Sequence, residues 1–154
     1  MRIRKATVKD FEKLKQIRIE FFLLEASTDT RLNPDGIKRG LPVSIAKSLR
    51  SKDEINLIAE MDGEIIGYAS SEIIKNQSWV KHKRQGHLYN LYVKPKYQRK
   101  GIGKKLLEKS LEWFKQRAVK DIKILCYVKN TLAQKLYKKY GFTDYMKVLK
   151  RIDK

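Results

Sequence analysis

Apolar residues near the start of the chain recur at intervals that predict a strand and then a helix. Residues 3–6 form the strand, and the helix runs to about Leu24. Thr7 and Asp10, three positions apart before it, resemble a capping box with Asp in place of the usual Glu. The apolar residues that repeat every three or four positions are Phe11, Leu14, Ile17, Phe21 and Leu24.

The connection after this helix is expected to be irregular. Residues 25–41 contain many turn residues, including Gly40 and the run Asn33-Pro34-Asp35-Gly36. Pro42 suits the first turn of a helix, and apolar spacing continues from it to about Ser51. The sequence therefore predicts a short second helix that begins at Pro42.

The clearest local signal in the chain is a β-hairpin. Residues 55–61 and 64–74 are two largely apolar runs separated by Asp62-Gly63. Asp-Gly is a preferred dipeptide for the type I′ turn, whose twist matches that of the flanking strands. Gly67 lies within the second run and is typical of a bulge.

The second half of the chain alternates strands and helices. The predicted elements are a polar, basic loop at 75–86, a strand at 87–93, a helix that follows Gly101 and Gly103, a strand at 122–128 buried on both faces, a helix from Asn130 to Gly141, and a last strand at 146–152. The element order indicates an α/β or α+β protein with a single mixed, mostly antiparallel twisted sheet and helices on both faces. We expect residues 1–154 to form a single domain, because there is no linker, repeat or low-complexity tract.

Composition excludes several classes of protein. No apolar run approaches the roughly 18 to 20 residues needed to span a bilayer, so no membrane partner is expected. The N-terminus has no apolar segment typical of a secretory signal. Cys126 is the only cysteine, so an intramolecular disulfide cannot form and a cytoplasmic location is expected. Cys126 is interpreted as a core residue, and no His/Cys cluster has metal-ligand spacing, so no metal is expected.

The positive charge is concentrated in the second half of the chain. Residues 1–74 carry 13 Lys and Arg against 12 Asp and Glu, a net of +1, and residues 75–154 carry 23 against 5, a net of +18; the sum is the full +19. Within 75–109 there are 11 basic residues and one acid, Glu108. Such a field attracts phosphates, nucleic acid or acidic protein surfaces.

The run YQRKGIGKKLL at 97–107 lies in this basic stretch and opens a helix. Glycines before a helix N-terminus let the backbone approach a bulky anion, and the first amides of the helix can bind it. A Walker A motif is excluded, because Gln98 and Lys105 stand where it needs Gly and Ser or Thr. A Rossmann fingerprint is excluded too, because Leu106 stands where the third glycine belongs. The residues alone leave a phosphate site and a simple turn as alternatives.

Two motifs together resemble the GCN5-related N-acetyltransferase superfamily. The first is Gln98-x-x-Gly101-x-Gly103 after a strand, and the second runs from Asn130 to Phe142 with the pattern N-x-x-A-x-x-x-Y-x-x-Y-G-F. The resemblance implies the acyl-CoA N-acyltransferase (GNAT) fold and an acetyl-CoA-dependent N-acetyltransferase that acts on a primary amine. The acceptor would be a small molecule or a protein, and the enzyme would be a monomer or homodimer.

The resemblance also assigns roles to individual residues. Backbone amides from Arg99 to Lys104 would hold the pyrophosphate of acetyl-CoA, and the strand at 91–93 would offer backbone groups to its pantetheine arm. The implied cofactor-binding positions are Leu91, Tyr92, Val93, Gln98, Arg99, Lys100, Gly101, Ile102, Gly103, Lys104, Asn130, Ala133 and Tyr137. Tyr137 matches the general acid that protonates the departing thiolate of coenzyme A.

The general base is less well marked. The family often places a carboxylate on the strand that corresponds to 87–93, and this chain has none there. His87 is the nearest titratable group with a suitable intrinsic pKa and is the candidate base. Glu72, Glu25 and an ordered water are the alternatives.

Two other functions compete with catalysis. The basic stretch 75–109, with Trp79 and Tyr89, is compatible with a module that binds nucleic acid or the ribosome. The absence of a carboxylate from 87–93 is compatible with an acyl-CoA-binding sensor that has no activity. For an acceptor, the positive charge favours an acidic peptide, a ribosomal context or an anionic metabolite over a polyamine.

Overall fold

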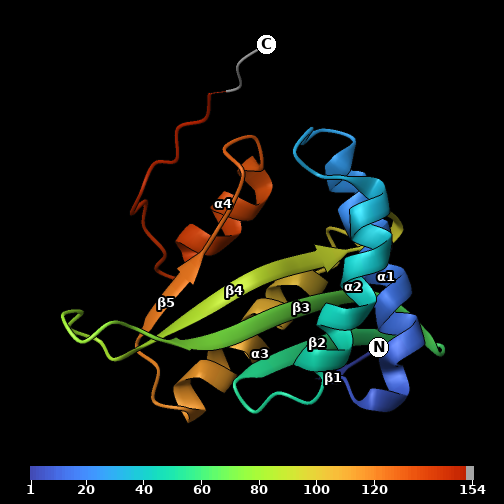
Figure 1. The fold of residues 1–154 in the computed structure, drawn as a ribbon. Coiled ribbons are helices and arrows are strands. Elements are labelled where there is room, and N and C mark those ends of the chain that lie inside the picture. Colours follow the sequence, from blue (N-terminus) through green and yellow to red (C-terminus); the bar gives the residue numbers. More distant parts are fainter. Residues whose placement is uncertain (152–154) are drawn as a thin grey trace.

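A computed structural model describes residues 1–151, which form one five-stranded mixed sheet in the order β1-β2-β3-β4-β5 (Figure 1). The strands are β1 (Arg2–Lys5), β2 (Glu54–Met61), β3 (Glu64–Lys75), β4 (Arg84–Val93) and β5 (Asp121–Ile124). The first four pair antiparallel, and β5 pairs parallel with β4. The predicted fold class is confirmed.

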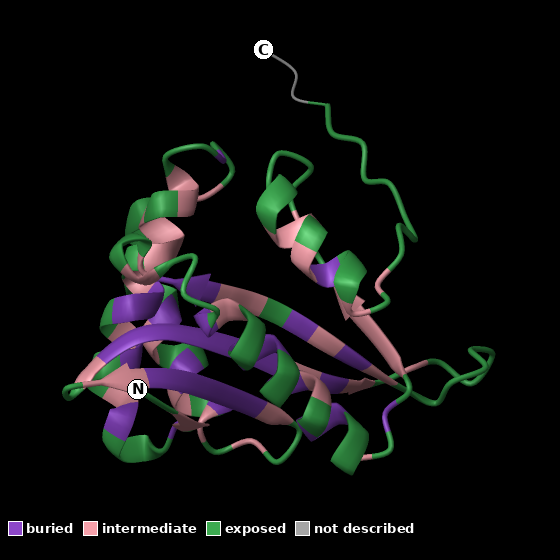
Figure 2. Cartoon of the chain, turned by 180° about the vertical axis from the view of Figure 1, so that it is seen from behind, coloured by how far each residue is buried: buried purple, intermediate pink, exposed green. Residues whose placement is uncertain are grey.

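Helices cover both faces of the sheet. The helices are α1 (Phe11–Ala26), α2 (Pro34–Ser48), α3 (Ile102–Gln116) and α4 (Thr131–Lys139), with short 3-10 turns η1 (Val8–Asp10) and η2 (Pro95–Tyr97). Apolar residues of α1 and α2 pack on one face around Tyr68 and Ile58. Those of α3 pack on the other face around Ile66 and Ala69, and α4 joins α3 on that side through Tyr137. The strands lie buried between these layers (Figure 2).

The hairpin of β2 and β3 forms as the sequence predicts. Asp62 has a φ of 50° and Gly63 a φ of 76°, the left-handed pair that a type I′ turn requires. Ala59 pairs with Gly67 but Glu60 pairs with Ile65, so the extra residue of a bulge lies next to Gly67. A Cβ at Gly67 would lie 2.9 Å from the carbonyl oxygen of Tyr92, which adds a reason for glycine there.

β4 changes partners halfway along its length. A second bulge lies at Tyr89, since Ser70 pairs with Asn90 and Ser71 with Leu88. Only the first half of β4 pairs with β5, and the last pair is Leu88 with Ile124. After that pair the two strands separate, as Figure 1 shows, and the second half of β4 is bonded to β3 alone.

The predicted second helix is wrong in its start. α2 begins at Pro34, not at Pro42, so the stretch expected to be irregular is largely helical. Asn33 is the N-cap, and its side-chain oxygen accepts from the amides of Asp35 and Gly36 at 3.0 and 3.3 Å. The Asn-Pro pair, interpreted as a turn, is the start of a helix with Pro at its first position. Pro42 lies inside the helix.

The end of the chain also differs from its prediction. β5 is four residues long instead of seven, and all four are half-buried instead of covered on both faces. The strand expected at 146–152 is absent over 146–151, and residue 152 lies outside the described residues. Both differences have one cause, because β5 lies at the sheet edge and no neighbouring strand pairs with its outer side in the described chain.

A glycine on β4 provides a test of how closely α3 packs on the sheet. A Cβ at Gly86 would lie 2.6 and 2.8 Å from ring atoms of Phe114, which is fully buried. We expect Gly86→Ala to lower the free energy of unfolding by about 1–3 kcal/mol, measured by urea denaturation. Gly40→Ala is the control, because nothing lies within 4 Å of its Cβ, and we expect it to stabilise α2 by up to ~1 kcal/mol. Equal midpoints for Gly86→Ala and wild type would contradict the packing.

Candidate active site

The loop between β4 and α3 passes twice through the left-handed backbone region. Arg99 has a φ of 60° and Gly101 a φ of 76°. Any residue with a Cβ is strained there, whereas glycine adopts this φ freely. Gly101 is the N-cap of α3, so this conformation delivers the chain directly into the helix. Glycine is therefore favoured at position 101 by the backbone itself.

The N-terminus of α3 presents free amides. Lys105 donates to the carbonyl of Gly101 at 3.1 Å and is the first amide bonded within the helix. The amides of Ile102, Gly103 and Lys104 donate to no group in residues 1–151. Free N–H groups and the partial positive charge of a helix start together form an anion site.

This loop is anchored on the second half of β4. The side-chain amide of Gln98 donates to the carbonyl of Val93 at 2.9 Å. A Cβ at Gly103 would lie 3.4 Å from Leu91, so the first turn of α3 rests on the strand. Tyr92 and Val93 are buried core residues on opposite faces of the sheet. The groups that β4 can offer a ligand between the separated strands are therefore those of its backbone.

Basic side chains surround the same N-terminus. Arg99, Lys100 and Lys104 are all exposed. The Lys104 ammonium lies 3.9 Å from the Glu108 carboxylate, and that of Lys100 lies 5.7 Å from the ring centroid of Tyr97. Their charges add to the attraction of the free amides for an anion, and they remain accessible to it.

Helix α4 is capped at both ends as the sequence predicts. The side-chain oxygen of Asn130 accepts from the amide of Ala133 at 3.1 Å. Gly141 has a φ of 84°, its amide donates to Lys138, and the amide of Phe142 donates to Tyr137. These two bonds form a Schellman motif. The caps fix both the register and the end of α4.

Tyr137 lies where α4 meets β4 and α3. It is buried together with Leu88 and Leu107, and Cys126 packs against the same cluster. Burial raises the pKa of Tyr137 to about 12, and Cys126 contributes in the same direction. The phenol therefore keeps its proton at neutral pH. The sequence motifs thus come together around the gap between β4 and β5, with the glycine loop at one end and Tyr137 at its side.

His87 belongs to a different cluster. It lies on the half of β4 that is still paired, opposite Glu72 of β3 and Lys123 of β5. Its Nε2 lies 2.9 Å from the side-chain oxygen of Gln85. Burial lowers the pKa of His87, Lys123 lowers it further, and Glu72 opposes both. Tyr89, at the bulge, donates its hydroxyl proton to Glu72.

A cluster that sequence reasoning did not assemble lies across the mouth of the gap. The hydroxyl of Tyr127, in the loop after β5, donates to Asp29 at 2.8 Å. Tyr127 also interacts with Glu25 at the end of α1, whose pKa is raised by burial. The negative charge of Glu25 in turn raises the pKa of Cys126, and Cys126 packs against the cluster that contains Tyr137. Tyr127 lies in the segment 122–128 that was predicted to be a buried strand, so the sequence offered no reason to expect its hydroxyl to meet Asp29 and Glu25.

Two absences concern the described part of the chain. Within residues 1–151 no group of three or more His, Cys, Asp or Glu side chains could hold a metal ion. None of the helices there has both the length and the apolar character that crossing a membrane demands.

Comparison with known proteins gives a consistent result. A model of the acetyltransferase (GNAT) family matches residues 13–142. An N-alpha-acetyltransferase of Sulfurisphaera tokodaii is 33% identical over 107 residues, which cover 66% of this chain and 64% of that protein, less than two thirds of its length. A spermidine N(1)-acetyltransferase of Thermoplasma acidophilum is 26% identical over 147 residues, covering 91% of this chain and 86% of that protein.

Solved structures extend the likeness over nearly the whole chain. A GCN5-related N-acetyltransferase of Ralstonia eutropha superposes with a TM-score of 0.80 at 21% identity, covering 98% of this chain and 97% of that one. A predicted acetyltransferase of Clostridium acetobutylicum, solved with acetyl-CoA, has a TM-score of 0.73 at 26% identity, covering 98% of this chain and 95% of that one.

The ionisation of His87 can be measured directly. Its pKa is lowered from the ordinary value of 6.5, so we expect the ring to be neutral at pH 7. Lys123→Ala should raise this pKa, because a cation beside the imidazole is removed, and Glu72→Gln should lower it, because an anion is removed. NMR titration of the imidazole signals measures both shifts, with His82 in the exposed loop after β3 as the second histidine in each spectrum. Shifts of the same sign in both variants would contradict this charge arrangement.

Proposed function

The chain belongs to the acetyltransferase (GNAT) family, and on that premise we propose that it is an acetyl-CoA-dependent N-acetyltransferase acting on a primary amine. The observation that carries the proposal is the free N-terminus of α3, held by Gly101 beside the half of β4 that has no β5 partner. The anion site lies at one end of a row of backbone groups on β4. Such a site suits a long ligand that carries a pyrophosphate and an extended amide-containing arm, and coenzyme A is such a ligand.

We assign the pyrophosphate to the amides of Ile102, Gly103 and Lys104. Arg99 and Lys100 would contribute charge from the exposed side of the loop. The pantetheine arm would lie between β4 and β5, against the backbone of Leu91 to Val93 and beside Asn130 and Ala133. The thioester would then reach the buried cluster that contains Tyr137.

The reaction is direct transfer within a ternary complex. The amine nitrogen, once neutral, forms a bond to the acetyl carbon, and the oxygen of the thioester carbonyl becomes an oxyanion held by a backbone N–H of β4. The carbon–sulfur bond then breaks, and the sulfur leaves with the electron pair. Tyr137 gives its proton to the thiolate, and the proton lost by the amine goes to a base.

The environment of Tyr137 keeps its proton available for the role of acid. A phenol whose pKa is raised to about 12 by burial is protonated at every physiological pH and can donate to a departing thiolate. The pKa of Tyr137 is raised mainly because the hydroxyl is shielded from water. A thiolate in the same pocket would also be shielded from water, and a hydrogen bond from the Tyr137 hydroxyl would replace the lost hydration.

Two groups compete for the role of base. His87 has a lowered pKa and is neutral at pH 7, as a base must be, but it lies before the separation of β4 and β5. Glu25 has a pKa raised by burial, which strengthens it as a base, and its field reaches Cys126 beside Tyr137. The position of Glu25, near the cluster of Tyr137, favours it over His87 as the base. The protonation state alone does not decide between the two residues.

The acceptor class is open among amines. The two relatives described above carry the names of an N-alpha-acetyltransferase and a spermidine acetyltransferase, so likeness to them favours neither a peptide nor a polyamine. The carboxylate of Glu25 stands near the proposed mouth of the site, whereas that of Asp29 is already paired with Arg31. Glu25 provides a local attraction for an ammonium group that the net charge of +19 does not.

The role of Gly101 gives the first test. Gly101 and Gly63 both have a φ of 76° and open space around a built Cβ. An alanine at either position costs about 1–2 kcal/mol of backbone strain, so both variants should lose similar stability. Only Gly101→Ala should also weaken acetyl-CoA binding, by roughly tenfold, because its Cβ would stand where the backbone must approach the pyrophosphate. Calorimetry measures the affinity, and an unchanged Kd in Gly101→Ala would place the cofactor elsewhere.

Turnover gives the second test. Acetyl-CoA is mixed with peptides bearing a free α-amine, amino acids, polyamines and aminoglycosides, and the free thiol of coenzyme A is measured. We expect amine-dependent thiol release with at least one class. Tight acetyl-CoA binding without release by any amine would support the sensor hypothesis. Binding of RNA without binding of acetyl-CoA would support the nucleic-acid module.

The same assay tests Tyr137. Tyr137→Phe removes the proton donor but keeps the ring in its cluster, so kcat should fall by roughly 100-fold or more with little change in acetyl-CoA affinity. Tyr140→Phe is the matched control at the C-cap of the same helix, because its hydroxyl donates to exposed Glu108 at 2.6 Å. Equal kcat values in the two variants would remove Tyr137 from the mechanism.

A further inference from the structure

Basic residues gather at the end of the sheet that lies opposite the glycine loop. β2 begins there at Glu54, β3 ends there at Lys75, and β4 begins there at Arg84. β4 has ten residues, and at about 3.3 Å per residue roughly 30 Å separate its start from its end at Val93. Cations at this end therefore lie far from the free amides of α3, where we place the pyrophosphate.

Three segments that carry only positive charge meet at this end. The loop 75–84 has four Lys and Arg residues, the segment 115–120 at the end of α3 has three, and 50–52 before β2 has two, and none of these segments contains Asp or Glu. The guanidinium of Arg84 donates to the carbonyl of Arg117 at 3.2 Å, and that of Arg117 donates to the carbonyl of Lys52 at 2.7 Å. These two hydrogen bonds join the three segments into one surface, which we call the basic end.

The cations of the basic end have no carboxylate partner in the described chain. None of them forms an ion pair within residues 1–151, whereas Arg4 in β1 pairs with both Asp10 and Glu60. The acid that directly follows the segment 115–120 is Asp121, and its carboxylate accepts from the side-chain amide of Gln85 at 2.8 Å instead. Unpaired cations keep their full attraction for a chain of phosphates.

One exposed tryptophan stands among these cations. Trp79 is 81% exposed, and its ring contacts no other ring and no cation among the described residues. Trp113, the other tryptophan, is instead buried beside Phe114, with the Arg117 guanidinium 5.1 Å from its ring centroid. An indole in the open adds nothing to the core, and tryptophan is a preferred residue at binding surfaces.

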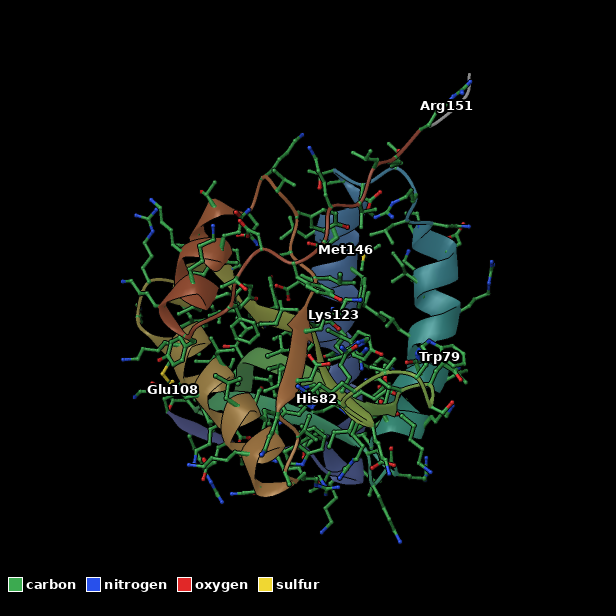
Figure 3. The ribbon with its side chains drawn as sticks, turned by 90° about the vertical axis from the view of Figure 1, so that its left-hand side faces the viewer. Trp79, His82, Glu108, Lys123, Met146 and Arg151 are labelled. Atoms are coloured by element: carbon green, nitrogen blue, oxygen red, sulfur yellow. The ribbon has the colours of Figure 1, made fainter. Side chains whose placement is uncertain are left out.

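The loop holds Trp79 in a defined position. A 3.0 Å hydrogen bond between the backbone groups at the two ends of 77–80 closes a turn that has Trp79 at its tip. At the base of the loop, the backbone amide of Asn76 donates to the carbonyl of Lys83 at 2.9 Å, and its side-chain amide donates to that of His82 at 2.8 Å. Figure 1 shows this loop projecting from the body of the molecule, and Figure 3 shows Trp79 and His82 on the side from which it projects. A ligand that uses Trp79 therefore meets a loop whose backbone is already ordered.

We propose that the basic end binds a single strand of RNA, with a base stacked on Trp79 and the flanking phosphates bound by the surrounding Lys and Arg side chains. Every base has a flat π-face that stacks on an aromatic ring, and cations beside that ring follow the phosphate backbone. A single strand suits the site because the bases of a duplex are already stacked on one another. The inference does not depend on the proposed enzymatic function, since its residues lie at the other end of β4.

Two other negatively charged partners fit this surface less well. An acidic peptide would pair with the cations, but its carboxylates have no flat face to cover Trp79. An anionic membrane would need a wide apolar face beside the cations, and the loop offers only Trp79 and Val80, which is 37% exposed. RNA uses both the ring and the charges.

The first experiment separates local charge from net charge. Fluorescence anisotropy measures the binding of a labelled oligouridylate of about 12 nucleotides, a length in the range that single-strand sites cover. The double variant Lys81→Glu with Lys83→Glu should weaken binding by roughly tenfold or more, because phosphate contacts carry much of such an affinity. Lys38→Glu with Arg39→Glu is the matched control, since both side chains are exposed on α2 and the net charge changes equally. Circular dichroism should show that both variants are folded. No binding by the wild-type protein at low salt, or an equal loss in the two double variants, would overturn the proposal.

The second experiment tests the stacked base. Trp79→Ala should weaken binding of the same RNA by roughly tenfold, and Trp79→Phe should recover most of the affinity because a ring remains. RNA should also quench the tryptophan emission of the wild-type protein and leave that of Trp79→Phe unchanged, since the buried Trp113 is then the only tryptophan. If Trp79→Ala binds the RNA as tightly as wild type does, no base stacks on this ring and the proposal is wrong.

The third experiment identifies the partner and its place. Saturating acetyl-CoA should leave the affinity for the RNA unchanged, because the two ligands lie at opposite ends of β4. Displacement of the RNA by acetyl-CoA would place it on the glycine loop and refute a separate site. Polyglutamate and vesicles that contain anionic lipid are the other probes, and we expect both to bind more weakly than the RNA and without dependence on Trp79. Tighter binding of either probe, with a loss in Trp79→Ala, would assign the basic end to an acidic peptide or a membrane instead.

Discussion

The separation of β4 from β5 after Leu88 is the constraint on which the rest of this structure depends. A parallel pair of strands normally continues until one strand ends, and each backbone group then has its partner. Here β5 stops at Ile124, while β4 runs on to Val93 with bonds to β3 alone. The bulge at Tyr89 adds local twist at the same place. Half a strand is thereby left without a strand partner on one side, where the side chain of Gln98 bonds the carbonyl of Val93 and the remaining backbone groups are open to a ligand.

The other parts of the site follow from that gap. The chain leaves β4 at Val93 and must enter α3 within a few residues, which requires the left-handed turn at Gly101 and leaves the first amides of α3 beside the unpaired backbone. Helix α4 covers the gap from one side, and its caps at Asn130 and Gly141 bring Tyr137 to the cluster with Leu88. The positive charge of the second half of the chain then acts on a ligand whose position the backbone has already set.

The same edge explains the end of the molecule. Because β5 is the last strand and is short, its outer side has no neighbour in the described chain, and the following apolar segment has no strand to join. An uncovered sheet edge exposes backbone N–H and C=O groups that can pair with another strand.

The sequence by itself determined what depends on neighbours along the chain. The Asp62-Gly63 turn, the helix from Ile102, the caps of α4 and the charge asymmetry all follow from a few adjacent residues, and the two spaced motifs identified the family. The sequence led to a wrong prediction where one local pattern is compatible with two structures. Asn33-Pro34 is the example, because Asn-Pro begins a helix as readily as a turn. Only the tertiary structure decided the length of β5, the fate of the segment after Phe142, and the cluster of Tyr127 with Asp29 and Glu25. These depend on which strand or side chain lies opposite in space, and hydrogen-bond pairing between distant segments leaves no periodic trace in the sequence.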